Sequence, residues 1–235
     1  MTDQRASSSS GSDVTSLSVA VLGGTGDQGR GLARRLAASG NPVIIGSRSA
    51  ERAVAAADGL GGGPGIRGMA NEEAARTGDV VIVAVPYEGH RDLLVSLADA
   101  LAGKIVIDCV NPIAFDGRGC YPLDVPEGSA AEQAAAVLPR SVVVGAFHHV
   151  SAVLLLDPEV AAIDLDVLVL GDDRSATDLT AALAARIPGV RGVYAGRLWN
   201  CRQVEALTAN LVSINRRYKA HAGLRITDID IPQPG

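Results

Sequence analysis

Short apolar segments alternate with alanine-rich segments of helical period along most of the chain. Apolar runs of roughly four to eight residues are typical of strands covered on both faces, and the alanine-rich segments are long enough for crossover helices. The predicted strands are 18–22, 43–46, 66–69, 80–85, 104–108, 142–147 and 166–170. This alternation predicts an α/β fold, a Rossmann-like doubly wound and mostly parallel sheet with a small C-terminal helical subdomain.

Helix signals lie between these strands. Asn71 is a candidate N-cap of a short helix, and Ser129 with Glu132 forms a capping box before another. Residues 113–128 carry glycine and proline and are predicted as a loop. The last helix, about 200–221, has an apolar stripe that must pack against the sheet domain or a partner subunit. Its members are Val204, Leu207, Leu211, Ile214 and Tyr218.

The chain divides into three parts on this pattern. Residues 1–16 are polar and serine-rich, without the apolar core of a signal peptide, and are predicted as a disordered tail. Residues 17–150 form the predicted dinucleotide-binding domain. Residues 151–235 form a smaller C-terminal domain that is expected to pack on it.

The first predicted strand runs into Gly24-Thr25-Gly26-Asp27-Gln28-Gly29, a G-x-G-x-x-G sequence that opens a helix. In this setting the first glycine permits a tight turn, the second lets a pyrophosphate approach the backbone, and the third lets helix and strand pack closely. Free N–H groups at the helix start then face the phosphates. The sequence predicts a dinucleotide site here, and a glycine turn that serves packing alone is the alternative.

The residues after the second strand select the dinucleotide. NAD enzymes place a carboxylate there, which accepts hydrogen bonds from the ribose hydroxyls. This chain has Gly46-Ser47-Arg48-Ser49 instead, with Arg52 one turn along the next helix. A hydroxyl and two guanidinium groups suit a 2′-phosphate, which an aspartate would repel. The pattern favours NADP(H) over NAD(H), and two solvated surface arginines are the alternative.

Composition and charge argue against several other classes. The formal net charge of −5 gives no long-range attraction for nucleic acid or for an anionic membrane surface. The sequence has no apolar run of about 18 residues that would suggest a transmembrane span. The three cysteines, Cys109, Cys120 and Cys201, have neither disulfide nor metal-ligand spacing. We expect no metal site, no nucleic-acid or membrane partner, and a reducing, cytoplasmic environment.

Further motifs accompany the glycine turn over nearly the whole chain after the tail. They are Leu22-Gly-Gly-Thr-Gly-Asp-Gln-Gly-Arg-Gly31 with Ile45-Gly-Ser-Arg48, Val83-Ala-Val-Pro86, Gly145-Ala-Phe-His148 and Leu198-x-Asn-x-Arg-x-Val-Glu-x-Leu-Thr208. Together they resemble the F420-dependent NADP oxidoreductases, which exchange hydride between NADP(H) and the 8-hydroxy-5-deazaflavin coenzyme F420. The doubled glycine and Gly-Ser-Arg are shared with related reductases, including the NADPH domain of membrane ferric reductases, whereas the C-terminal pattern is more specific.

The resemblance implies an NADPH:coenzyme F420 oxidoreductase that acts as a homodimer. By resemblance, Thr25–Gln28 would bind the pyrophosphate, and Ser47, Arg48 and Arg52 would bind the 2′-phosphate. The nicotinamide would lie over Val85, Pro86 and Val110. It would face the deazaflavin near His148 and Val150. No catalytic acid or base is required, because hydride passes directly between two stacked rings. The protein then supplies proximity and orientation.

Two other functions fit the residues alone. One is an NADPH-dependent reductase of another acceptor, such as a flavin, a ferric chelate or a small carbonyl or imine compound. The other is a non-catalytic NADPH sensor that regulates a partner protein. Val85, Val110 and Val150 are expected to line an open crevice beside the nicotinamide. A sensor would not need such a crevice, so these residues favour an enzyme.

Several other polar residues have structural interpretations. His148 and His149 either contact the deazaflavin or act as hydrogen-bonded structural histidines. Arg202 and Glu205 have the i, i+3 spacing of a helix-surface ion pair. His90 follows the 80–85 strand and is expected among solvated residues at a helix start.

Overall fold

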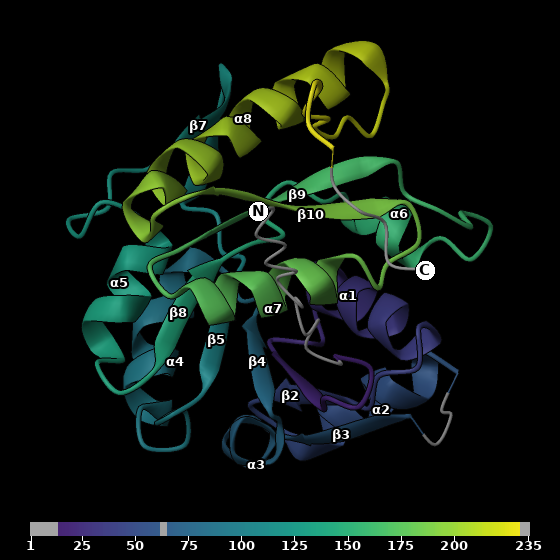
Figure 1. Cartoon of the computed structure of the whole chain (residues 1–235), viewed down its shortest axis with the longest axis vertical. Coiled ribbons are helices and arrows are strands. Elements are labelled where there is room, and N and C mark those ends of the chain that lie inside the picture. The colour runs from purple at the N-terminus through teal and green to yellow at the C-terminus, as the bar shows by residue number, and fades with distance from the viewer. Residues whose placement is uncertain (1–13, 62–64, 231–235) are drawn as a thin grey trace, which may run out of the picture.

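An eight-stranded sheet in the order β10-β9-β8-β5-β4-β1-β2-β3 forms the centre of the computed structural model, which describes residues 14–61 and 65–230 (Figure 1). Its strands are β1 Val19–Leu22, β2 Val43–Ser47, β3 Ile66–Ala70, β4 Val80–Val83, β5 Ile105–Asp108, β8 Val142–Gly145, β9 Leu165–Gly171 and β10 Val190–Gly196. Every pairing in this sheet is parallel except that of β8 with β9. The chain winds from β1 out to β3, returns to β4 on the other side of β1 and continues outward, which confirms the doubly wound fold.

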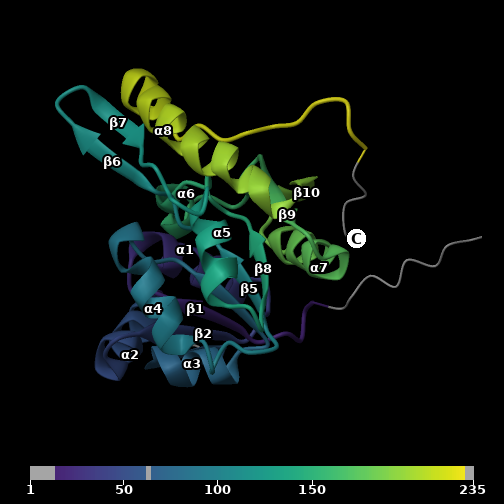
Figure 2. The ribbon, with the colours of Figure 1, turned by 90° about the vertical axis from the view of Figure 1, so that its left-hand side faces the viewer.

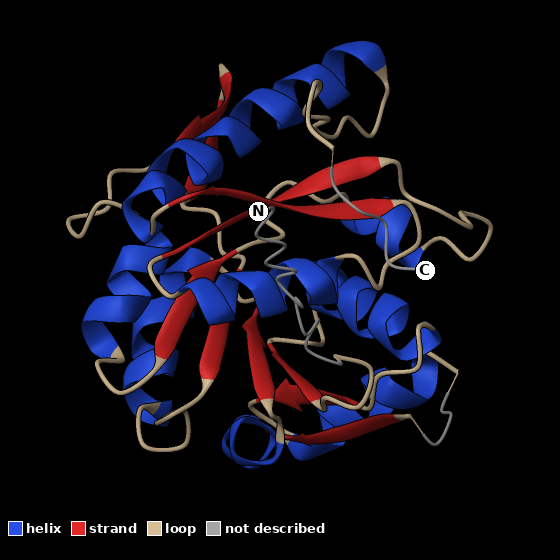
Figure 3. Cartoon of the chain, in the orientation of Figure 1, coloured by secondary structure: helices blue, strands red, loops and turns tan. Residues whose placement is uncertain are grey.

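Helices cover both faces of the sheet (Figure 3). They are α1 Asp27–Ala38, α2 Ala50–Gly59, α3 Asn71–Thr77, α4 His90–Leu97, α5 Ala130–Val137, α6 Ala152–Leu156, α7 Arg174–Ala184 and α8 Cys201–Tyr218, with short 3-10 helices η1 Tyr87–Gly89 and η2 Leu198–Asn200. Alternate residues of β1 show how the core is divided. Val19 and Val21 pack with residues of α1, α2, α6 and α7, whereas Ala20 and Leu22 pack with residues of α3, α4, α5 and α8.

Three local predictions were wrong. The segment predicted as a loop contains an antiparallel hairpin, β6 Ile113–Asp116 and β7 Gly119–Pro122. None of its strand residues is fully buried, so the strands lack the apolar alternation of a core strand. Strand β10 escaped prediction because an edge strand does not need a continuous apolar run. Asn71 is the first residue of α3 and makes no cap bond, since Ala70 is the N-cap.

The described residues also bear on the predicted boundaries. Because β9 pairs with β8, residues beyond 150 extend the same sheet, and the predicted division at residue 150 does not coincide with a break in it. Most of the predicted tail lies outside the described residues. Val14, within it, is only 5% exposed, and its carbonyl accepts a hydrogen bond from Asn41 Nδ2 at 2.7 Å.

Helix α8 and the β6–β7 hairpin project together from the sheet (Figure 2). We call this pair the arm. The first part of the predicted stripe on α8 packs on the sheet domain, where Val204 belongs to the core, and Leu211 is buried farther along the helix. The second part is unpartnered within the described chain, since Ile214 is 40% and Tyr218 is 72% exposed.

Candidate functional site

The β1–α1 turn carries the predicted pyrophosphate residues at the carboxyl end of β1. Gly23, with φ of 72°, adopts the left-handed conformation that reverses the chain, so the turning role expected for Gly24 belongs to its neighbour. A Cβ on Gly24 would lie 2.7 Å from the Val21 carbonyl oxygen, and one on Gly29 would lie 2.7 Å from Gly24 Cα. Positions 24 and 29 therefore require glycine, because helix, turn and strand pack too closely there for a Cβ atom.

Gly26 is glycine for a different reason. Its φ of −80° is open to any residue, and a Cβ there would meet only the Gly23 carbonyl oxygen, at an ordinary 3.6 Å. Nothing among the residues that the structure describes excludes a side chain there. Gly26 directly precedes α1, whose first N–H groups have no partner inside the helix. The open space over Gly26 fits a pyrophosphate bound at the helix N-terminus.

The predicted 2′-phosphate residues lie beside this turn. Gly24 N donates to the Gly46 carbonyl oxygen at 3.1 Å, which places Ser47, the last residue of β2, next to the turn. Arg48 and Arg52 are both exposed. Among the described residues, no hydrogen bond or ion pair engages either guanidinium group. Two unpaired guanidinium groups and a hydroxyl fit a phosphate dianion at this edge of the sheet.

The predicted nicotinamide and deazaflavin residues follow β4, β5 and β8, which are neighbouring strands. Pro86 is exposed and Val85 is half-buried against the turn, where a Cβ on Gly23 would meet Val85 Cγ1. Val110 and Val150 are 2% and 5% exposed, so they offer little free surface. Their contact with the nicotinamide and the deazaflavin remains a prediction.

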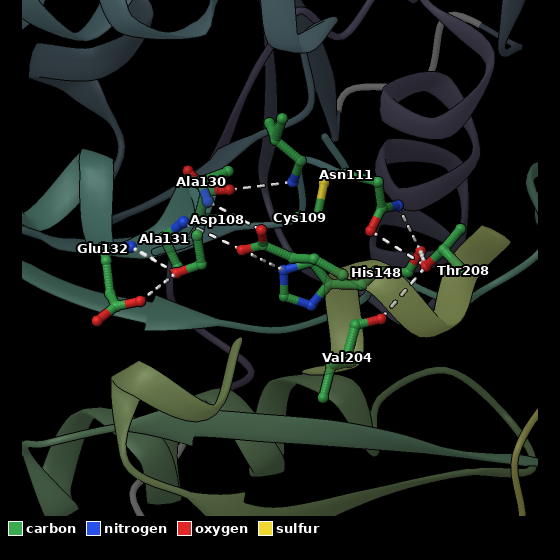
Figure 4. A network of polar contacts seen from close by, with 12 residues as sticks. Asp108, Cys109, Asn111, Ala130, Ala131, Glu132, His148, Val204 and Thr208 are labelled. Atoms are coloured by element: carbon green, nitrogen blue, oxygen red, sulfur yellow. Dashed lines mark hydrogen bonds and ion pairs between the residues drawn. The ribbon is translucent and has the colours of Figure 1, made fainter. Parts of the chain in front are cut away.

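Three side chains hold the loop after β8. Two of them, Asn111 and Thr208, come from elements that sequence reasoning did not connect to it (Figure 4). Gln28 Nε2 donates to the Phe147 carbonyl oxygen at 3.2 Å, and Phe147 has an unusual φ of 64°. Asn111 Nδ2 donates to the His148 carbonyl oxygen at 2.8 Å, and Thr208 Oγ1 donates to Asn111 Oδ1 at 3.1 Å. The nucleotide helix, the end of β5 and α8 thus fix one loop.

His90 is fully buried, so its prediction as a solvated residue was wrong. Its Nε2 lies 2.6 Å from Asp108 Oδ2, and its Nδ1 lies 3.1 Å from Gln133 Oε1. Burial alone would lower the pKa of His90, but the charge and hydrogen bond of Asp108 outweigh it and raise that pKa. The pair ties α4 to the end of β5 beneath the site.

Glu205 is also buried, which contradicts the expected surface ion pair with Arg202. Its carboxylate accepts hydrogen bonds from Ala130 N at 2.8 Å and Ala131 N at 3.2 Å, at the start of α5. Arg202 Nε instead donates to the Gly128 carbonyl oxygen. Burial raises the pKa of Glu205 to about 8 against those two backbone hydrogen bonds.

The His148 ring points into this buried region. Its Nε2 lies 3.9 Å from Glu205 Oε1, and the side chain has no exposed surface. Burial lowers the pKa of His148 to about 4, so the ring is neutral at pH 7. Among the described residues neither ring nitrogen of His148 has a hydrogen-bond partner, and the predicted contact of His148 with the deazaflavin is untested.

None of the described helices is long and apolar enough to cross a membrane. The described part of the chain also brings together no group of three or more histidine, cysteine, aspartate or glutamate residues that could hold a metal ion.

Comparisons with known proteins place this chain in a family. Residues 18–112 match the family model described as NADP oxidoreductase, coenzyme F420-dependent. The F420-dependent NADP reductase of Methanothermobacter marburgensis is 41% identical over 91% of this chain and 99% of its own length. That of Methanocaldococcus jannaschii is 40% identical over 92% and 100%. A crystal structure of a putative F420-dependent NADP reductase from Arthrobacter sp. FB24 matches 90% of this chain and 99% of its own, with a TM-score of 0.78 and 28% identity. The chain belongs to the F420-dependent NADP reductase family.

Proposed function

We propose that this chain catalyses reversible hydride transfer between the nicotinamide of NADP(H) and the 8-hydroxy-5-deazaflavin ring of coenzyme F420. The observation that carries the proposal is the unpaired Arg48 and Arg52 beside the open Gly26 turn, in a chain 41% identical to an F420-dependent NADP reductase. These residues fit the 2′-phosphate and the pyrophosphate of one substrate.

The residues of the chain bind and orient the two coenzymes, and none of these residues is assigned as a catalytic acid or base. Gly26 and the start of α1 bind the pyrophosphate, while Ser47, Arg48 and Arg52 bind the 2′-phosphate. Bound NADPH supplies the hydride at its nicotinamide. Gln28 joins the two halves of the site, because it lies in the first turn of α1 and donates a hydrogen bond to the carbonyl of Phe147, in the loop after β8. Such orientation is the protein's main contribution to a direct transfer between rings.

A spectrophotometric assay tests this function. Protein mixed with NADPH and oxidised F420 should bleach the visible absorption of the deazaflavin, and should reduce FMN or ferric citrate far more slowly. Absence of bleaching by protein that still binds NADPH would reject the proposal and favour the sensor. Faster reduction of FMN or ferric citrate would favour another acceptor.

Replacing Arg48 by alanine should weaken NADPH binding by roughly 10- to 100-fold, because a charge-assisted hydrogen bond is worth about 1.5–3 kcal/mol. NADH lacks the 2′-phosphate, so its affinity should hardly change. Isothermal titration of both nucleotides measures the difference. Arg174→Ala, at an exposed arginine on α7, is the matched control. Equal losses for NADPH and NADH would contradict the assignment.

We further propose a homodimer that forms through the outer face of the arm. The exposed Ile214 and Tyr218 continue the apolar stripe of α8, and the exposed Phe115 and Tyr121 lie on the hairpin beside it. Sedimentation should show a dimer for the wild type and a monomer for Ile214→Glu/Tyr218→Glu. A monomeric wild type, or a variant that dimerises equally well, would contradict this interface.

We also propose that the protein acts in the cytoplasm. All three cysteines are free, and Cys109 and Cys201 are buried thiols. Burial raises the pKa of Cys120, so this half-exposed thiol also favours its protonated form. Unpaired cysteines of this kind suit a reducing compartment.

A further inference from the structure

A buried ion pair lies beneath the nucleotide site, and the function proposed above does not use it. Asp108, the last residue of β5, and His90, the first residue of α4, both have fully buried side chains. Asp108 Oδ2 lies 2.6 Å from His90 Nε2. Burying two charges is costly, and an apolar pair of similar volume is often at least as stable. Stability alone therefore gives no reason for charged residues at these two positions.

The hydrogen-bond partners of His90 require a proton on each of its ring nitrogens. Gln133 Nε2 donates to Glu127 Oε2 at 3.1 Å, so the other amide atom of Gln133, Oε1, faces His90 Nδ1 as an acceptor. The carboxylate of Asp108 is an acceptor as well. Because both partners accept, His90 donates from both nitrogens and carries a positive charge opposite the negative charge of Asp108. The raised pKa of His90 agrees with this assignment.

The two oxygens of the Asp108 carboxylate have different neighbours. Oδ2 contacts His90, whereas Oδ1 accepts a hydrogen bond from Val110 N at 3.0 Å. The carboxylate thus lies between the histidine ring and the backbone of Val110, and it forms the end of the ion pair that is nearer to Val110. Val110 is one of the residues predicted to lie beside the nicotinamide.

The position of β5 in the sheet agrees with that prediction. The nucleotide turn follows β1, with β2 on one side of it and β4, then β5, on the other. In doubly wound sheets, ligands bind outside the carboxyl ends of the strands where the strand order reverses, which here is between β1 and β4. In the proposed binding mode the 2′-phosphate lies at β2 and the pyrophosphate at β1, so the nicotinamide extends toward the ends of β4 and β5.

We propose that the Asp108 carboxylate, which His90 keeps ionised, selects between the oxidised and the reduced nucleotide. The nicotinamide ring is neutral in NADPH and positively charged in NADP⁺, because oxidation removes a hydride with its negative charge. A buried carboxylate acts on that charge through a low dielectric and is little screened by salt. Asp108 therefore favours bound NADP⁺ and makes bound NADPH a better hydride donor. The inference rests on the nucleotide site of the proposed function and adds a determinant of redox state to it.

Titration of NADP⁺ and of NADPH, each without a deazaflavin, tests Asp108 by binding alone. Asp108→Asn keeps an oxygen that accepts from Val110 N but removes the charge, and burial then leaves His90 neutral. The affinity for NADP⁺ relative to NADPH should fall by roughly 3- to 10-fold, since the carboxylate lies nearer to the ring than the histidine that balances it. Asp166→Asn is the matched control, because Asp166 is also fully buried and lies 2.6 Å from Arg191 Nε, but at the start of β9.

The double variant Asp108→Asn/His90→Gln covers the case in which the single replacement unfolds the chain. Two amides can hydrogen-bond to each other without a buried charge, and the same fall in the affinity ratio is expected. An unchanged ratio in a folded variant would overturn the inference, because a structural role alone would weaken both nucleotides alike. An equal fall in Asp166→Asn would also overturn it.

Bleaching of F420 by the wild type judges the proposed function separately. Bleaching together with an unchanged ratio in the Asp108 variants would retain the proposed function and reject the role of Asp108. Absence of bleaching together with the expected fall would reject hydride transfer to the deazaflavin and retain that role. A wild type that binds neither nucleotide would overturn both.

Discussion

Replacing Arg35 by methionine should lower the free energy of unfolding by about 3–5 kcal/mol, because it leaves four carbonyl groups, one buried and three half-buried, without this donor. Arg35 lies on α1 and is only 8% exposed. Its Nε donates to the Leu155 carbonyl oxygen at 2.9 Å, and its Nη1 donates to that of Val160 at 2.6 Å. Its Nη2 donates to the carbonyl oxygens of Leu154 and Asp157. One guanidinium group thus fastens α6 and the chain after it to the nucleotide helix.

Urea denaturation of Arg35→Met, Arg35→Lys and Arg91→Met measures this effect. Lysine keeps the charge but has no planar fork to reach carbonyls on several sides, so Arg35→Lys should recover only part of the loss. Arg91 is exposed on α4, and its replacement should change stability by less than about 0.5 kcal/mol. If Arg35→Met were as stable as Arg91→Met, the hydrogen bonds of Arg35 to these carbonyl groups would not contribute to stability.

The buried His149 should make the protein unstable in acid. It is 4% exposed, and its Nε2 accepts a hydrogen bond from Leu168 N at 3.4 Å. Burial lowers the pKa of His149 from 6.5 to about 4, against the opposing charge of Asp166. The unfolded chain therefore binds a proton at His149 between pH 6.5 and 4 while the folded chain does not. Stability from this group is complete above pH 6.5 and is lost as the pH falls.

The expected loss from His149 is of the order of 3 kcal/mol at pH 4, since one pKa unit corresponds to about 1.4 kcal/mol. His149→Gln keeps an acceptor for Leu168 N but does not titrate. The free energy of unfolding of wild type and variant, measured in urea from pH 7 to 4, should converge as the pH falls. Parallel curves for the two proteins would show that His149 titrates normally in the folded state.

His148 and Glu205 also contribute to the pH dependence of the free energy of unfolding. Burial lowers the pKa of His148 to about 4, so it adds a loss of the same sign. Glu205, whose pKa burial raises to about 8, acts in the opposite direction. The folded chain holds that proton more tightly than the unfolded chain, so between the ordinary pKa of 4.5 and about 8 its contribution declines as the pH rises. Both groups are present in wild type and variant. Glu205 cancels in the difference, whereas His148 does so only in part, because the charge of His149 also lowers the pKa of His148.

Local patterns in the sequence were enough to predict the nucleotide half of the site. Every contact that this half needs is made within one strand–turn–helix unit or between adjacent strands. Gly26, Ser47 and Arg48 could therefore be assigned from their positions relative to the predicted strands. The doubly wound fold class could be predicted for a similar reason, because buried parallel strands are continuous apolar runs and their crossovers have a fixed hand.

Tertiary structure decided the buried polar residues and the arm. His90 and Glu205 have ordinary surface patterns in the sequence, and they are buried because Asp108 on β5 and the N–H groups of α5 supply partners 18 and 75 residues away. The hairpin was missed because its side chains pack against α8 and not into the core. Sequence by itself determined the fold class and the family and predicted the nucleotide turn, because all three depend on local spacing. Only the folded chain could bring Gln133 to His90, or Arg35 to the carbonyls after residue 153, because such contacts depend on where distant segments meet and leave no periodic signal.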